Sequence, residues 1–130
     1  MTMIAAIDPK AELLSLLDAA VAAHANLVQI RVESGRALVE TLAAGRVVAV
    51  VDWPLERCSE ALPAAFALCD GADDYQYGSS RTARMTGETV ALPAGVAMVF
   101  IQFFPARDGQ RHLVARLTYD SDTCCGTCGA

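Results

Sequence analysis

Cysteines are concentrated at the end of the chain, where residues 121–130 read SDTCCGTCGA and hold three of the five cysteines. Cys125 and Cys128 have the C-x-x-C spacing, which suits a two-point clamp on zinc or a dithiol–disulfide couple. Cys124 adds a third soft ligand. A closed zinc site takes four ligands, and His112 is the histidine placed to supply the fourth. Cys124, Cys125 and Cys128 are therefore the candidate metal or thiol-redox site.

The surroundings of these three cysteines favour a simpler interpretation. A thioredoxin-type motif stands at the start of a helix, whose dipole lowers a thiol pKa, and no helical pattern follows Cys128. The chain also has no second C-x-x-C pair. We therefore expect residues 121–130 to be a flexible, reactive tail, with zinc binding or thiol redox chemistry kept as the alternative.

The other cysteines and the second histidine have structural explanations. Cys58 and Cys69 lie eleven residues apart, both on the apolar side of a predicted helix. Buried free cysteines behave as small hydrophobic residues, which is the role we expect here. His24 falls at the predicted end of the first helix, where it suits a C-terminal cap.

No polar or aromatic cluster in the sequence requires chemistry. The acidic residues Asp70, Asp73 and Asp74 lack the glycine and distal glutamate of an EF-hand loop, so a solvated loop is expected. Ser79-Ser80 beside Arg81 and Arg84 suits either an anion or an ordinary exposed loop. The bulky aromatic residues are expected in the core before a ligand pocket; they are Trp53, Phe100, Phe103 and Phe104. We predict that the protein is not an enzyme.

Composition excludes several classes of partner. The 130 residues fit one domain, and the net charge of −5 with a single lysine, Lys10, argues against nucleic-acid binding. No apolar run reaches the ~20 residues of a membrane span, so membrane insertion is not expected. The opening MTMIAAIDPK lacks the basic and apolar regions of a signal peptide. We therefore predict a cytoplasmic protein.

The first half of the chain predicts one helix followed by an antiparallel meander. Asp8 and Pro9 are a plausible N-cap and first helical residue, and the apolar spacing continues to about Ala25. Three strands are predicted over 27–33, 36–42 and 46–52, separated by the tight-turn pairs Ser34-Gly35 and Ala44-Gly45. Because Arg46-Val-Val-Ala-Val-Val-Asp52 shows no polar alternation, it is expected to be the most deeply buried of the three.

The second half predicts another helix and a long hairpin. Pro54 suits a helix start, and Pro63 inside the apolar pattern predicts a kink or two short helices. A short edge strand is expected over 82–85, and strands over 96–104 and 111–119 are joined at Asp108-Gly109. The whole predicts an α+β domain over residues 1–120. Its antiparallel sheet has about five to six strands with two main helices packed on it, a PAS-like arrangement.

The order of elements and several short strings resemble a known domain. It is the small domain that precedes the motor in ATPases of type II secretion, type IV pilus and conjugation systems. The strings are Asn26-Leu27-Val28-Gln29-Ile30 after the first helix, the hairpin over 37–47, and the final hairpin over 97–117. The chain departs from that family in three ways. It has no Gly-x-x-x-x-Gly-Lys-Ser/Thr loop, the family's acidic–histidine pair is Leu27 and Gln29, and its nucleotide-facing arginine is Phe100.

The resemblance implies a stand-alone relative without a motor. We therefore expect a non-catalytic adaptor or regulatory domain that acts by protein–protein interaction, with a secretion or pilus assembly component as partner. Association of identical chains stays open, and no cofactor is expected apart from zinc at the cysteine tail. The alternatives are a small metal-binding or thiol-redox protein using Cys124, Cys125 and Cys128, and a PAS-like sensor of a small ligand.

Overall fold

The protein is a two-layer α+β domain. The computed structural model describes residues 8–71, 80–105, 107 and 109–120. Its elements follow in the order α1 (Pro9–Ala22), β1 (Leu27–Glu33), β2 (Arg36–Ala43), β3 (Arg46–Pro54), α2 (Leu55–Ala67), β4 (Arg81–Met85), β5 (Val96–Phe103) and β6 (Arg111–Tyr119). The predicted fold class, an antiparallel sheet of six strands with two helices, is confirmed.

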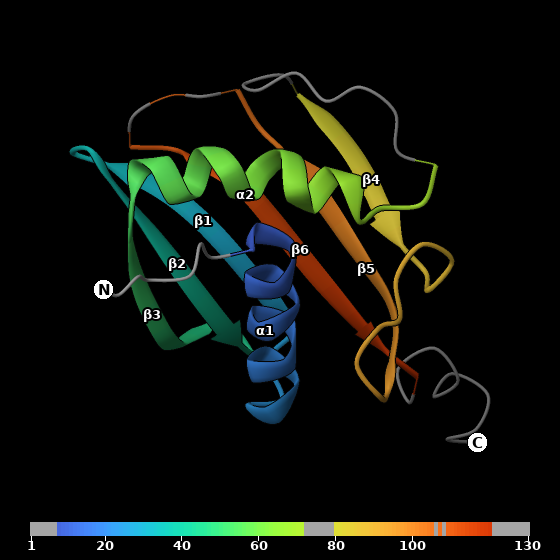
Figure 1. Ribbon diagram of the computed structural model, residues 1–130. Coiled ribbons are helices and arrows are strands. Elements are labelled where there is room, and N and C mark those ends of the chain that lie inside the picture. The colour runs from blue at the N-terminus through green and yellow to red at the C-terminus, as the bar shows by residue number, and fades with distance from the viewer. Residues whose placement is uncertain (1–7, 72–79, 106, 108, 121–130) are drawn as a thin grey trace, which may run out of the picture.

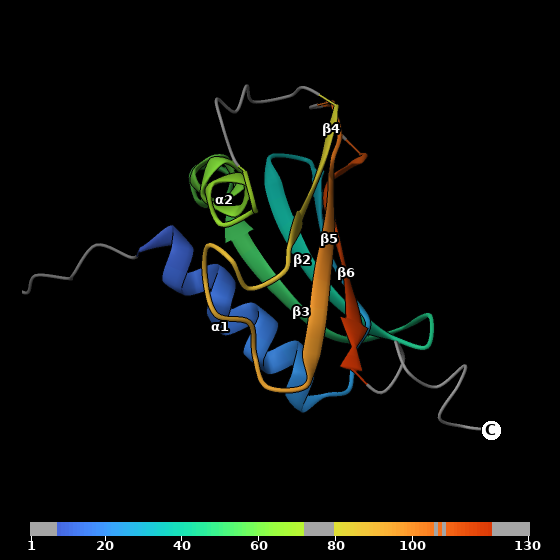
Figure 2. The ribbon, with the colours of Figure 1, turned by 90° about the vertical axis from the view of Figure 1, so that its right-hand side faces the viewer.

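The six strands form one open sheet in the order β3-β2-β1-β6-β5-β4, and every neighbouring pair is antiparallel. The two sequence halves meet where β1 pairs with β6 at the centre, so that Leu27 lies opposite Arg116. β3 and β4 are the two edges (Figure 1). Both helices cover the same face of the sheet, and in the described part of the chain no helix lies on the other face (Figure 2).

α1 begins as the sequence predicts and ends in a defined cap. The Asp8 side chain accepts a hydrogen bond from the Lys10 amide (3.1 Å), and Pro9 occupies the first turn. At the other end, the Ala25 amide donates to the Ala20 carbonyl (2.8 Å) and the His24 amide donates to the Val21 carbonyl. These two bonds form a Schellman motif, whose left-handed position is normally glycine and here is His24, with φ 55°.

Two tight turns set the register of the β1–β2–β3 meander. Ser34-Gly35 and Ala44-Gly45 have positive φ at both positions, the signature of the type I′ turn that matches the twist of paired strands. Both turns confirm the predicted hairpins. The connection between β5 and β6 is longer, over residues 104–110, and is tied to β1 by a hydrogen bond from the Gly109 amide to the Val32 carbonyl (2.7 Å). Asp108 of the predicted turn lies outside the described residues.

The core lies between the helices and one face of the sheet. Alternate strand residues such as Ile30, Val39 and Val99 point into it, and α2 contributes Leu62 and Phe66. The Phe66 and Phe103 rings meet edge to face at 5.7 Å. Within the described residues, no helix is both long and apolar enough to cross a membrane.

Two local expectations were wrong. α2 is one helix through Pro63, so of the two predicted alternatives, a kink or two short helices, the second is wrong. Ser59, whose carbonyl loses its partner at that proline, is exposed and can be hydrated, so the helix tolerates the change. Cys69 does not lie on α2, because the helix ends at Ala67.

The third misjudged element is β3, which was expected to be deeply buried. It is instead an edge strand, and every residue from Arg46 to Asp52 is exposed. The cause is topological, since β1 uses its second side for β6 and leaves β2 and β3 to extend the sheet outward.

Candidate functional site

The predicted metal or thiol site at Cys124, Cys125 and Cys128 lies outside the described residues. Among the residues that the structure does describe, no three His, Cys, Asp or Glu side chains come together in a way that would hold a metal. His112 is buried in β6, where its Nε2 lies 3.1 Å from the Arg107 carbonyl oxygen. His24 is exposed at the end of α1.

The two buried cysteines are not placed for thiol chemistry. Cys58 and Cys69 are free and almost wholly inaccessible, as predicted for small hydrophobic residues. Burial raises the pKa of the Cys58 thiol to about 11. Burial, with a smaller contribution from Asp70, raises that of Cys69 to about 12. Both therefore stay protonated near neutral pH, and a protonated thiol is a poor nucleophile or ligand.

The polar cluster around Asp70 serves the fold. The Thr86 amide donates to Asp70 Oδ2 (3.1 Å), and the Thr86 hydroxyl donates to the same carboxylate. Arg81 lies over the Phe66 ring, with its guanidinium carbon 4.6 Å from the centroid. Asp73, Asp74 and Ser79 lie outside the described residues.

The four aromatic residues do not converge on one pocket. Trp53 and Phe103 are buried on the helix-covered side, whereas Phe100 and Phe104 are half-buried. Phe100 lies on the uncovered face, opposite Arg116 of β6. The Trp53 indole N–H is buried without an acceptor among the described residues, and the Arg57 guanidinium lies 5.7 Å from its ring.

One apolar cavity lies between the helices and the sheet. Its walls are aliphatic side chains of both layers, including Leu13, Leu17, Ile30 and Met85. The space amounts to about 30 Å³, whereas pockets for drug-sized molecules hold roughly 300 Å³ or more. This cavity does not favour a small-ligand sensor.

The largest unexplained feature is the exposed aliphatic surface of β3. Five side chains form what we call the β3 patch, and their exposed fractions are Val47 49%, Val48 50%, Val50 54%, Val51 42% and Leu55 39%. They are the only large hydrophobic residues exposed to this extent in the described part of the chain. Exposed apolar surface gathered in one place marks a contact with another molecule far more often than scattered single residues do.

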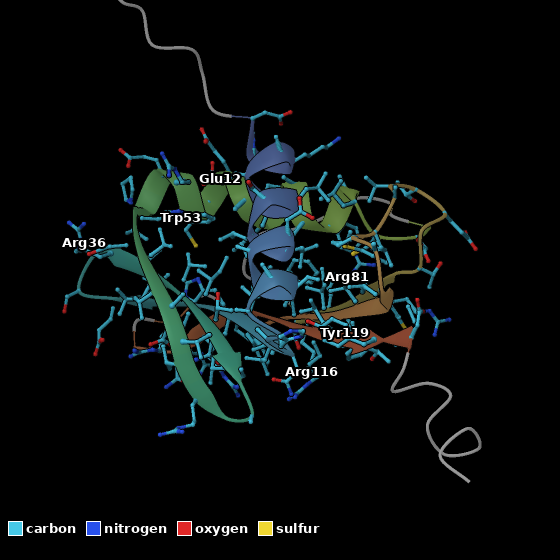
Figure 3. The ribbon with its side chains drawn as sticks, turned by 90° about the horizontal axis from the view of Figure 1, so that it is seen from below. Glu12, Arg36, Trp53, Arg81, Arg116 and Tyr119 are labelled. Atoms are coloured by element: carbon cyan, nitrogen blue, oxygen red, sulfur yellow. The ribbon has the colours of Figure 1, made fainter. Side chains whose placement is uncertain are left out.

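The β3 patch reaches both faces of the sheet. Val51 lies opposite Val39, which is buried under the helices, and Val50 lies opposite Glu40 on the uncovered side. Neither valine is covered, because the helices lie over the strands nearer the centre and α2 reaches only the Trp53 end of β3 (Figures 1 and 3). The strand is therefore apolar on both faces of the sheet along its free edge.

The opposite edge of the sheet is protected in the ordinary way. β4 has five residues, of which Arg81 and Arg84 are charged, and short charged edges discourage strand pairing. β3 has nine residues, with no charge between Arg46 and Asp52. One protective device is present on β3, a bulge at Val48, where Thr41 faces Ala49 and Leu42 faces Val47. Beyond that bulge, β3 has the composition of an interior strand.

The uncovered face is polar at its centre. Glu40 accepts hydrogen bonds from Gln29 Nε2 (2.8 Å) and from Arg31 (3.2 Å), and Arg31 also pairs with Glu33. These bonds, that from Gln29 first, hold the pKa of the Glu40 carboxyl below its usual value. Arg116 is exposed on the same face, on the side away from the helices (Figure 3). The face is therefore polar along β1 and β2, whereas Val114 of β6, which lies opposite Gln29, is wholly buried.

Comparison with known proteins supplies no identity. No protein-family model matches the chain, and a search of curated proteins finds no relative.

The β3 patch was missed by sequence reasoning because its signal is ambiguous. A run of valines without polar alternation is typical of a strand buried inside a sheet. The same run is typical of an edge strand that another chain covers. The turn residues and the lack of polar alternation correctly indicate a strand without a polar face over residues 46–52. They do not indicate whether that strand lies inside the sheet or at its edge.

Proposed function

We propose that the protein is a non-catalytic adaptor or regulatory domain that acts by protein–protein contact through the β3 patch. One observation carries the proposal, namely a nine-residue edge strand that exposes four valines on both of its faces. A cytoplasmic location belongs to the same proposal, and the two free thiols Cys58 and Cys69 suit a reducing compartment.

The strand geometry points to strand addition as the binding mode. An extended segment of the partner would pair with the free N–H and C=O groups of β3, while its side chains meet Val50 on one face and Val51 on the other. Main-chain hydrogen bonds then give affinity, and the valines select an apolar partner strand. Leu55, at the start of α2, extends the apolar surface next to the end of β3.

The free energy gained by burying the apolar side chains of the β3 patch is large enough to affect binding. Burying a whole valine or leucine stabilises by roughly 1.5–3 kcal/mol, so each half-exposed patch residue would contribute on the order of 1 kcal/mol. Burying the five patch residues of this chain together with a comparable set on the partner would stabilise the complex by about 10 kcal/mol. This value falls inside the range estimated for the free-energy cost of association. A specific contact therefore needs a partner that is itself apolar there and that also forms main-chain hydrogen bonds with β3.

The resemblance to the pre-motor domain of secretion ATPases stays a proposal about context. It is supported by the order of a helix, three strands, a helix and a final hairpin, which the resemblance requires. In that context the partner strand would belong to a component of a secretion, pilus or conjugation system. The β3 patch does not itself identify such a component.

The experiment compares two substitutions at the two edges of the sheet. Val50→Lys places a charge in the centre of the β3 patch, and Thr82→Lys places the same charge on the exposed edge strand β4. Immobilised wild-type and variant proteins are exposed to a lysate of the source cells. Captured polypeptides are identified by mass spectrometry and re-measured as purified components by calorimetry.

The expected result is a partner that binds the wild type and Thr82→Lys and is lost with Val50→Lys. Lysine is a natural protector of edge strands, so both variants should keep the wild-type circular dichroism spectrum. Purified partners that bind all three proteins with equal affinity would contradict the proposal. Recovery of no secretion, pilus or conjugation component would count against the context alone.

A further inference from the structure

We infer that the partner of the β3 patch is a second copy of this chain, paired antiparallel through β3 about a two-fold axis at Val50. The inference rests on the proposed function, because it names the occupant of the same edge. It would join two six-stranded sheets into one continuous sheet and place the two β3 patches side by side, so that each shields the edge of the other. A two-fold contact of this kind uses the same surface on both copies.

The regular part of β3 determines where the axis lies. The bulge at Val48 interrupts the strand on one side, and Pro54, which has no amide hydrogen, ends it on the other. Trp53 is buried under α2, so the free regular segment is 49–52, and a two-fold pairing of its aliphatic residues 49–51 is centred on Val50. A pairing centred there stops short of both interruptions.

The side chains of Ala49, Val50 and Val51 complement their own two-fold copies. In an antiparallel pair centred on Val50, each Val50 lies opposite the other on the uncovered side, and it is the most exposed residue of the patch at 54%. On the helix side, the small Ala49 lies opposite the larger Val51, and the reverse holds across the axis. No bulky pair is forced together, and the aliphatic surface is continuous.

Charge distinguishes antiparallel from parallel pairing. β3 begins at the basic Arg46 and carries the acidic Asp52 near its other end, and Glu56 follows in the exposed first turn of α2. Antiparallel pairing brings the Arg46 end of each copy next to the Asp52–Glu56 end of the other. Parallel pairing would place like charges side by side, which is unfavourable across strands. Asp52 already binds Arg36 of its own chain (2.8 Å), so its charge is partly balanced within one copy and the acidic character of this end rests mainly on Glu56.

The first test measures mass in solution. The full chain is examined by sedimentation and by light scattering over roughly a hundredfold range of concentration. We expect the wild type and Thr82→Lys to reach twice the chain mass of 13.7 kDa, and Val50→Lys to stay at the monomer mass with an unchanged circular dichroism spectrum. A wild type that is monomeric throughout overturns the inference, as does a dimer that Val50→Lys leaves intact.

The second test measures the register, and it does not depend on a disruptive variant. Cysteine is introduced by Val50→Cys, or by Val47→Cys as the control, in a chain carrying serine at 124, 125 and 128. Residues opposite at the axis have Cβ atoms about 5 Å apart, so the two new thiols should form a disulfide on oxidation. Val47 is similarly exposed (49%), but its two copies would lie about 20 Å apart. Equal cross-linking of both variants would overturn the pairing.

The two tests also separate this inference from the proposed function. If the chain is monomeric but a purified partner binds in a Val50-dependent manner, the edge recruits a different protein. The homodimer is then wrong and the proposed function stands. If neither self-association nor partner binding depends on Val50, both are wrong.

Discussion

The end of α1 shows how a single residue stores avoidable strain. His24 occupies the left-handed position of the Schellman motif, with φ 55°. Side chains other than glycine and asparagine disfavour this conformation by roughly 1–2 kcal/mol. The His24 side chain is exposed, so its removal costs little packing.

We therefore expect His24→Gly to stabilise the protein by about 1 kcal/mol or slightly less, because glycine adopts positive φ without strain. Ala23→Gly is the matched control. Ala23 has an ordinary φ of −92°, so glycine there should destabilise. Chemical unfolding followed by the fluorescence of Trp53, the single tryptophan, measures both. A loss of stability in His24→Gly would show that the histidine ring contributes a contact.

At the two ends of α1, one feature could be predicted from the sequence and one could not. Asp8 and Pro9 were predictable as a cap and first turn because their roles are local and chemically specific. The left-handed conformation of His24 was not, because histidine carries no composition signal for it. The sites at Cys124, Cys125 and Cys128 stay a prediction, since they lie outside the described residues.

At the scale of elements, the pairing of β1 with β2 places the Glu40 carboxylate next to two hydrogen-bond donors. Glu40 binds Gln29 and Arg31, and these bonds lower its pKa from the usual 4.5. A carboxyl group whose pKa is lower in the folded state stabilises the fold above its unfolded pKa. That stability is lost as the pH falls through the folded pKa. The contribution should therefore be complete near neutral pH and decline as the pH falls below the usual pKa of 4.5.

Glu40→Gln should consequently be less stable than the wild type near pH 7, by at most about 1 kcal/mol because the pair is partly open to water. The difference should shrink in urea unfolding at about pH 3.5. Glu33→Gln is the control, since Glu33 pairs with the same arginine but is half exposed. A difference between wild type and Glu40→Gln that is the same at both pH values would contradict the role assigned to this carboxylate.

Elements were predictable where their signals are local. The tight turns at Ser34-Gly35 and Ala44-Gly45 and the alternation in β1 placed the first hairpins correctly. Pro63 was misread because a proline's effect on a helix depends on whether Ser59, four residues earlier, reaches water. The burial of β3 was predicted wrongly because strand composition does not determine where a strand lies in the strand order of the sheet.

At the scale of the whole molecule, the order of strands determines which strand is left at the edge of the sheet and is open to a partner. The central pairing of β1 with β6 joins segments more than eighty residues apart, such as Leu27 and Arg116, and no local pattern specifies it. That pairing moves an interior-type strand to the edge. In the inferred dimer, β3 becomes a central strand of a larger sheet, and its valines gain neighbours from the second copy.

The inferred dimer also leaves the polar faces free. Because the two-fold axis is perpendicular to the joined sheet, the helices of both copies lie on the same side. The two uncovered faces, each carrying Glu40 and Arg116, then form one broad surface on the other side. The homodimer is thus compatible with an adaptor that presents two identical surfaces to further partners.

Hydrogen exchange along β3 tests the central claim most directly. Amides of segment 49–52 that point to the free edge exchange rapidly in a monomer and slowly when they pair with a second strand. We predict that peptides covering β3 exchange more slowly in the wild type than in Val50→Lys at the same concentration. Peptides covering the edge strand β4 should exchange at the same rate in both. Equal exchange of β3 in the two proteins would show that its edge is unpaired, and would contradict the role proposed for the β3 patch in self-association.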